Sequence, residues 1–249
     1  MFRGRRVCAA RLLAAALVFC GCVSLLPRSV HAGDDEEDDA HFILFSGRDI
    51  WRNGAFLYGG ATWSPGGFEQ DGFLFKFLLS GGLYRYRATG LAVDQVVGAE
   101  WRAAVMAGWR VKRGPLEAKI FFGPEFQNNR LWPDDPGNRL RGHAVGLRFG
   151  INLWAEPTPA TMAAGDASLS TIGSNYSARA AFGWKLFNRF YAGPETQVYG
   201  GDGYAQVRFG AHLTSLKTGD TEWSAGGGWA VDSERNGSLY LRLGLLQHR

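Results

Sequence analysis

The sequence predicts an all-β protein, an antiparallel transmembrane β-barrel of about ten strands with a polar interior and an apolar, lipid-facing exterior. Apolar and polar residues alternate with a period of two in 116–127, 204–214 and 239–246, which is typical of strands. Tryptophans stand near the ends of the apolar faces of other predicted strands, as the aromatic girdles of membrane barrels require: Trp63, Trp101, Trp109, Trp184, Trp223 and Trp229. An N-terminal export signal would deliver the chain to the compartment where these barrels assemble.

Residues 1–32 have the three parts of a cleaved signal peptide. Four arginines precede the short apolar run 12–23, and Val30-His31-Ala32 resembles a cleavage site. A single transmembrane anchor is the alternative, but the run is shorter than the ~20 residues of a comfortable span. A lipoprotein signal ending at Cys22 is a further, lesser alternative.

Removal of this segment changes the charge and the cysteine count. Five of the 27 basic residues and none of the 23 acidic ones lie in it, so the mature chain has 22 basic and 23 acidic residues and a net charge of −1. The basic balance that would favour a nucleic-acid partner is therefore lost, and none is expected. All three cysteines also lie in the segment, which excludes disulfides, thiolate metal sites and cysteine nucleophiles from the mature protein.

Residues 33–50 are predicted to form an acidic disordered arm. Six consecutive acidic residues, 34–39, repel one another and bury nothing. A calcium site is the alternative, but an unstructured run does not fix ligand geometry.

The barrel is predicted to occupy residues 51–249. Turn-like pieces rich in glycine, proline, asparagine and aspartate separate the strands, and two longer connections are expected at 129–138 and 156–171. The predicted strands are 53–64, 70–80, 93–111, 115–128, 140–155, 173–187, 189–200, 202–216, 220–232 and 237–247. An exported soluble β-sandwich with a tryptophan-rich core remains the alternative, because alternation alone does not say which face meets lipid.

A decayed repeat supplies the candidate functional residues. FFGPEFQ at 121–127 returns as YAGPETQ at 191–197, and each copy precedes a strand that carries x-Arg-x-Gly. Alternation places the polar members in the lumen, where charges must be paired. The predicted lumen charge network is Glu125, Gln127, Arg148, Glu195, Gln197, Arg208 and Arg242. We expect Arg148 to pair with Glu125 and Arg208 with Glu195, and Pro124 and Pro194 to mark a bulge or a membrane boundary.

Several segments resemble one known family. The stretch WRNGAFLYGGATWSP at 51–65, GPETQ at 193–197, and RFGAHL at 208–213 continuing to KTG at 217–219 are similar to the cellulose biosynthesis protein BcsS family. The likeness covers nearly all of residues 45–249. It implies an outer-membrane protein that accompanies a bacterial cellulose synthase, with the synthesis or export complex, or the glucan chain itself, as its partner. It brings no catalytic residues. The chain ends in Leu246-Gln247-His248-Arg249, whereas many outer-membrane barrels end in an aromatic residue.

No catalytic group, cofactor or metal set is expected, and the histidines lack metal-binding spacings. The favoured function is a non-enzymatic accessory to cellulose synthesis or export. A small general porin or envelope-integrity barrel is one alternative. An outer-membrane lipid hydrolase that uses His212 with Thr214 or Ser215 is another. Asn128, Asn129 and Trp132 are a weak candidate for contact with glucan, since aromatic rings stack on sugar faces.

Overall fold

The computed structural model describes residues 40–88 and 95–249. The predicted signal peptide and the acidic run 34–39 lie outside these residues. No helix among the described residues is long and apolar enough to cross a membrane.

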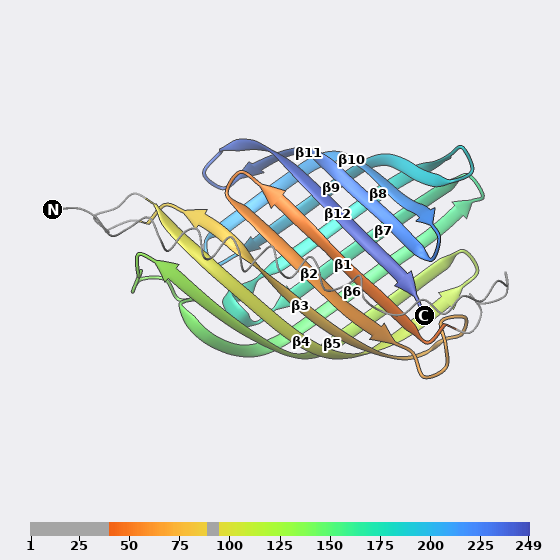
Figure 1. Cartoon of the computed structure of the whole chain (residues 1–249), viewed down its shortest axis with the longest axis horizontal. Coiled ribbons are helices and arrows are strands. Elements are labelled where there is room, and N and C mark those ends of the chain that lie inside the picture. Colours follow the sequence, from red (N-terminus) through yellow and green to blue (C-terminus); the bar gives the residue numbers. More distant parts are fainter. Residues whose placement is uncertain (1–39, 89–94) are drawn as a thin grey trace. The chain divides into compact units, whose positions relative to one another are not determined.

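Twelve strands form a closed antiparallel barrel in which every strand pairs with its neighbours in the sequence and β1 pairs with β12. The strands are tilted and run diagonally across the barrel wall (Figure 1). They are β1 Phe42–Trp51, β2 Gly54–Trp63, β3 Gly72–Tyr86, β4 Val96–Arg113, β5 Leu116–Trp132, β6 Gly142–Thr158, β7 Thr161–Ser170, β8 Tyr176–Leu186, β9 Phe190–Gly201, β10 Tyr204–Thr218, β11 Thr221–Asp232 and β12 Gly237–His248.

The structure corrects the predicted strand number and the predicted start of the barrel. The ten predicted strands are all present, but β1 and β7 were not foreseen. Strand β1 covers residues 42–51, so the barrel begins at Phe42 and the second half of the predicted disordered arm is part of its wall. Strand β7 lies inside the predicted connection 156–171, and β5 continues through the first residues of the predicted connection 129–138.

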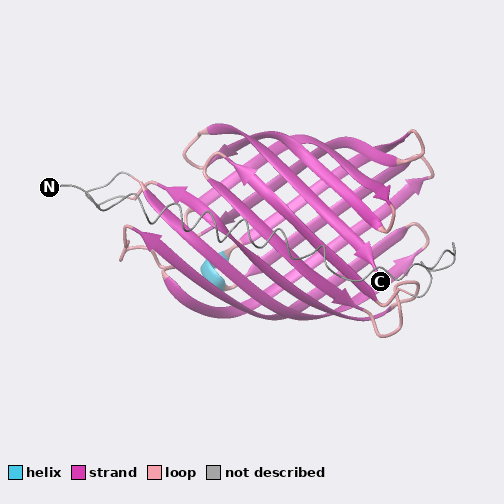
Figure 2. Ribbon diagram, viewed as in Figure 1, coloured by secondary structure: helices cyan, strands magenta, loops and turns pink. Residues whose placement is uncertain are grey.

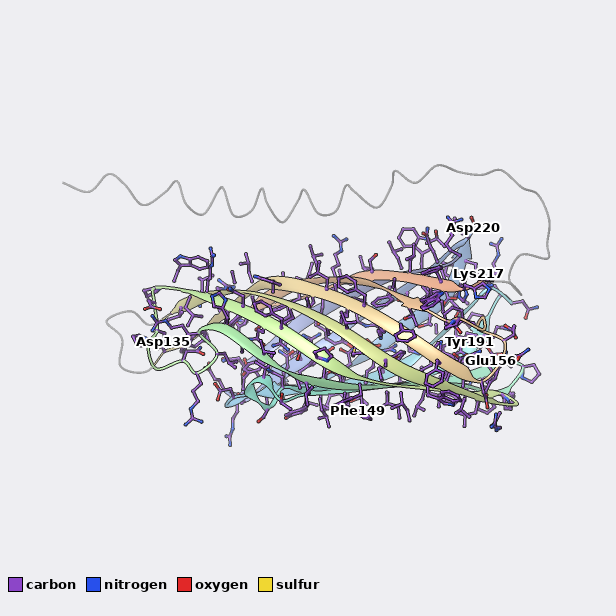
Figure 3. The ribbon with its side chains drawn as sticks, turned by 90° about the horizontal axis from the view of Figure 1, so that it is seen from below. Asp135, Phe149, Glu156, Tyr191, Lys217 and Asp220 are labelled. Atoms are coloured by element: carbon purple, nitrogen blue, oxygen red, sulfur yellow. The ribbon has the colours of Figure 1, made fainter. Side chains whose placement is uncertain are left out.

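Apolar side chains cover the outside of the barrel. Phe73 is 62% exposed and Val145 is 78% exposed, as expected for side chains whose neighbours would be lipid. Phe149 points away from the ribbon in the same manner (Figure 3). The tryptophans predicted to lie on the apolar face are all exposed, namely Trp63, Trp101, Trp109, Trp184, Trp223 and Trp229. An apolar outer surface supports the membrane alternative over the sandwich.

The two ends of the barrel differ in their connections (Figure 2). At the terminal end, where β1 begins and β12 ends, four turns of two or three residues and one longer loop, 64–71, join the strands. The distal end carries the longer connections 87–95, 133–141 and 171–175, the last containing the short 3-10 helix Ile172–Ser174. Asp135 marks the distal end in Figure 3, and Glu156, Lys217 and Asp220 mark the terminal end.

Part of the interior is an apolar cluster. Leu74, Ala104, Met106 and Phe121, from β3 to β5, pack with Ile43 of β1. Phe68, from the loop 64–71, is buried in the same cluster. This loop therefore folds over the terminal end beside β3–β5, and polar lumen residues such as Lys76 and Glu125 lie on these same strands.

Candidate functional site

Arg148 and Glu125 form the predicted ion pair on neighbouring strands β5 and β6. The Arg148 Nη1 atom lies 2.6 Å from Glu125 Oε1, and Arg148 Nη2 donates to Ser168 at 3.0 Å. Ser170 Oγ donates to the second carboxylate oxygen of Glu125. The carboxylate is buried, and donors on β6 and β7 satisfy both of its oxygens, as a buried charge requires.

Glu195 is the centre of a larger cluster. Its Oε2 atom accepts from Arg179 Nε at 2.8 Å and from Arg242 Nη2 at 3.0 Å. Its Oε1 atom accepts from Gln197 Nε2 at 2.9 Å and from Tyr240 Oη at 3.0 Å. Four donors from β8, β9 and β12 therefore hold one carboxylate in the lumen.

The predicted pair of Glu195 with Arg208 is wrong. Arg208 Nη1 instead lies 2.8 Å from both carboxylate oxygens of Asp49, and Arg208 Nε donates to Gln206 at 2.6 Å. The direction of the offset explains the difference. Arg148 is opposite Gly123, on the terminal side of Glu125, whereas Arg208 is opposite Gln197, on the distal side of Glu195. Arg208 is directed toward the distal end, away from the Glu195 carboxylate.

Three aromatic rings enclose the Arg208 guanidinium. Its carbon lies 5.0 Å from the Trp51 ring centre, 4.6 Å from that of Tyr199 and 5.0 Å from that of Tyr240. Arg208 is only 1% exposed. Such rings attract a guanidinium, most strongly where water is excluded. This group fills the lumen near the distal ends of β1, β9 and β10.

Gln127 lies among polar groups nearer the distal end. Its Nε2 atom donates to Glu100 at 3.4 Å, and Glu100 also accepts from Arg102 at 2.6 Å. The network residues predicted from the sequence therefore all lie inside the barrel, but they divide into clusters around Glu125, Glu195, Arg208 and Glu100.

The repeated Gly-Pro pairs have one structural role in both copies. Pairing of β5 with β4 stops at Glu125 and resumes at Phe122 without a change of register, and pairing of β9 with β8 stops at Glu195 and resumes at Ala192. A proline has no N–H to donate to the ladder. Pro124 and Pro194 thus interrupt one ladder in mid-strand, and the prediction of a bulge or membrane boundary there is wrong.

Two cavities occupy the middle and the terminal side of the lumen. The larger has a volume of about 360 Å³, and the smaller has about 180 Å³. Both are lined by Phe121, Asn152 and Asp166, so they adjoin. Arg179 lines the larger cavity and Arg148 the smaller.

His212 faces the lumen and is 3% exposed. Its Nδ1 atom lies 2.9 Å from Thr214 Oγ1, and its Nε2 atom lies 3.1 Å from the Phe182 carbonyl oxygen. Ser215 instead donates to Glu222 at 3.0 Å. The three residues considered for lipid hydrolysis are therefore not gathered on a lipid-facing rim. Within residues 40–88 and 95–249, no group of three or more potential ligands could hold a metal ion.

The glucan-contact candidates are not together either. The register of β5 with β4 places Trp132, Asn128 and the outward Trp101 on one face, whereas Asn129 is on the opposite face. Asn128 contacts His143 Nδ1 at 2.7 Å, and Asn129 donates to Tyr84 at 2.6 Å.

Sequence reasoning missed Asp49, Asp166, Lys76 and the tyrosines that support the network. Asp49 lies in the segment assigned to the arm, and Asp166 lies in the segment assigned to a connection. The alternation of Met162, Ala164, Asp166 and Ser168 with smaller residues was a weak signal for β7. Pro157 and Pro159, just before this strand, and the many alanines within it obscured the signal.

The fold defines the class of protein. A twelve-stranded closed barrel with an apolar outside and a charged inside has the architecture of outer-membrane β-barrels. A solved outer-membrane channel from Pseudomonas putida F1 is similar, with a TM-score of 0.53 and 8% identity over 88% of this chain and 100% of that chain. The β-domain of the Bordetella autotransporter BrkA is similar at a TM-score of 0.52, with 11% identity over 84% of this chain and 99% of that one.

The family is shown by the sequence. The profile of the cellulose biosynthesis protein BcsS family matches residues 43–249, and the chain belongs to that family. This range includes almost the whole barrel, from the second residue of β1 to the last residue of the chain. A comparison with curated proteins found no significant match.

Proposed function

We propose that this protein is a non-enzymatic outer-membrane barrel that assists the synthesis or export of bacterial cellulose. Membership of the BcsS family over the whole barrel carries this proposal. The barrel architecture and its apolar outer surface support the location.

The connections support one orientation in the membrane. Outer-membrane barrels have short periplasmic turns and longer extracellular loops. On this rule the terminal end faces the periplasm, and the distal end faces the medium. The interior would then be accessible to periplasmic molecules from the side that holds the two cavities.

The filled interior favours a helper over a conduit. Aqueous channels are typical of barrels with about 16 strands or more, and this barrel has twelve. The Arg208 and Glu195 clusters further occupy the lumen. A separate exporter would therefore carry the glucan, and this barrel would act beside it.

External cellulose and total glucan in a deletion strain test the proposal. We expect less external cellulose, with recovery on complementation, and the ratio of external to total glucan separates a synthesis defect from an export defect. A strain complemented with Asp220→Asn, at an exposed turn, is a matched control. Unchanged cellulose in amount and location would contradict the proposal.

A small porin is the second candidate, because the lumen contains two cavities. Ion conductance of liposomes that contain the wild-type barrel would favour it. A lipid-hydrolase role predicts that His212→Ala alters envelope lipid composition, and no contact of His212 in the structure favours it.

A further inference from the structure

We propose that the two adjoining cavities form a binding site for a short neutral oligosaccharide, of the β-linked glucan class. The identity of the sugar rests on the proposed function, whereas the site itself follows from the shape and chemistry of the lumen. The predicted charge network did not identify this site, because the two charged residues at its centre, Asp166 and Lys76, lie outside the sequence repeat.

The larger cavity has the size and access of a ligand site. Small-molecule sites have volumes of roughly 300–1,000 Å³, and the larger cavity has about 360 Å³ before its neighbour is included. Thr62, Glu117 and Glu222 line it, and each is one residue from the end of its strand at the terminal end. The cavity therefore reaches that end, on the proposed periplasmic side.

Four aromatic rings contribute to the wall of the larger cavity. Phe45, Tyr58, Phe121 and Trp154 line the larger cavity, and Trp154 is held edge-on by Tyr191 with ring centres 6.1 Å apart. The faces of pyranose rings carry C–H groups that pack on aromatic rings. Rings fixed at a polar cavity are thus suited to sugars rather than to fully apolar ligands.

Several polar groups remain available to a ligand. The Asp166 side chain is 47% exposed although it points into the barrel, and it lines both cavities. Asn152 and Arg179 orient its carboxylate at 2.8 Å and 3.3 Å. Tyr58 lines the larger cavity, and its hydroxyl makes no hydrogen bond to any other described residue.

Lys76 adds an ammonium group that has no carboxylate within ion-pair distance among the described residues. It lies 5.1 Å from the Phe45 ring centre and 4.8 Å from the Phe121 ring centre, at the wall of the smaller cavity. Hydroxyl groups can both accept from such a donor and donate to Asp166. Lys76 and Asp166 both line the smaller cavity and provide complementary partners for the hydroxyls of a sugar.

The charges around the cavities favour a neutral ligand. Glu117, Asp166 and Glu222 are acidic, and the basic lining residues are Lys76, Lys119, Arg148 and Arg179. Arg148 and Arg179 are already paired with the buried lumen carboxylates of Glu125 and Glu195. The three acids and four bases nearly balance, and most of them are already paired, so the lining selects strongly for neither an anion nor a cation.

Calorimetric titration of the purified full barrel in detergent tests the site. Cellotetraose is the probe, with maltotetraose and tetragalacturonate as the α-linked and anionic comparisons. We expect saturable binding of cellotetraose and much weaker binding of the other two. Absence of cellotetraose binding would overturn the proposal, and equal binding of maltotetraose would overturn its assignment to β-linked glucans.

Two shape-preserving variants locate the binding. Asp166→Asn and Tyr58→Phe should each weaken cellotetraose binding about tenfold, the size expected for one lost hydrogen bond to a charged or buried group. Asp220→Asn, which makes the same chemical change at an exposed turn, should leave binding unchanged. Binding that all three variants retain would place the sugar elsewhere and overturn the site.

The two proposals fail separately. A cellulose defect in the deletion strain without binding by the purified barrel would overturn only the oligosaccharide site. Binding without a cellulose defect would overturn only the accessory function.

Discussion

Arg179 and Glu195, on neighbouring strands β8 and β9, meet inside the barrel with Nε and Oε2 2.8 Å apart. Arg242 approaches the same oxygen from β12. One carboxylate on β9 therefore links the neighbouring strand β8 to β12, three strands away. The second copy of the repeat thus fixes the barrel by a contact across several strands, whereas Glu125 in the first copy binds to the next two strands.

Loss of the Glu195 charge should destabilise the barrel strongly. Glu195→Gln would leave Arg242 without its carboxylate partner and Arg179 with Asp166 alone, and breaking such a buried pair costs about 3 kcal/mol or more in free energy of unfolding. Denaturant unfolding in detergent, followed by tryptophan fluorescence, measures the change. Asp220→Asn removes an exposed pair with Arg249 and should cost under about 1 kcal/mol. Equal losses in the two variants would contradict the buried cluster.

Removal of the Arg208 side chain should open the distal part of the lumen. Arg208→Ala deletes the group that fills the space between Asp49 and three aromatic rings, and water can occupy that space. We expect single-channel conductance in planar bilayers to rise well above that of the wild type. Arg113→Ala, at an exposed turn, is the control and should not change conductance. An unaltered current in a folded Arg208→Ala barrel would show that other groups close the lumen.

Adjacent glycines of β11 should differ in their tolerance of a methyl group. A Cβ at Gly226 would lie 2.3 Å from Glu195 Oε1, an atom that two hydrogen bonds hold in place. A Cβ at Gly227 would come no closer than 3.4 Å to any atom. Gly226→Ala should therefore lower the free energy of unfolding by about 1–3 kcal/mol, and Gly227→Ala should change it little. A reversed order in unfolding experiments would rule out this account of the glycine run.

Arg48 should lower the stability of the barrel in a bilayer. It is exposed on the outer face of β1, and its strand neighbours there are Leu57 and Leu243. A lipid-facing arginine costs about 2–4 kcal/mol at the bilayer midplane and about 0–1 kcal/mol near the interfaces. Arg48→Leu should raise the free energy of unfolding in phosphatidylcholine vesicles by more than Arg130→Leu, which lies two residues from the end of β5. A smaller gain for Arg48→Leu would place it at the interface.

The sequence by itself determined the barrel class, the ten strands with clear alternation, and which face of each strand carries the charges. Strand alternation depends only on the period of two in the backbone, so it is readable locally. Strand β7 was missed because its outward residues are mostly alanine and glycine, which give little apolar contrast. Strand β1 was missed because the acidic run before it suggested a solvated arm.

Only the tertiary structure decided which charges pair and where the lumen is hollow. The Glu125–Arg148 pair was predictable from adjacent strands, but the same reasoning failed for Glu195 and Arg208, which also lie on adjacent strands. The partners of Glu195 and Arg208 were not predictable, because the closure of β12 onto β1 brings Asp49 and Arg242 into the lumen from opposite ends of the chain. Long-range contacts of this kind depend on the stagger and curvature of the closed barrel, which local patterns in the sequence do not contain.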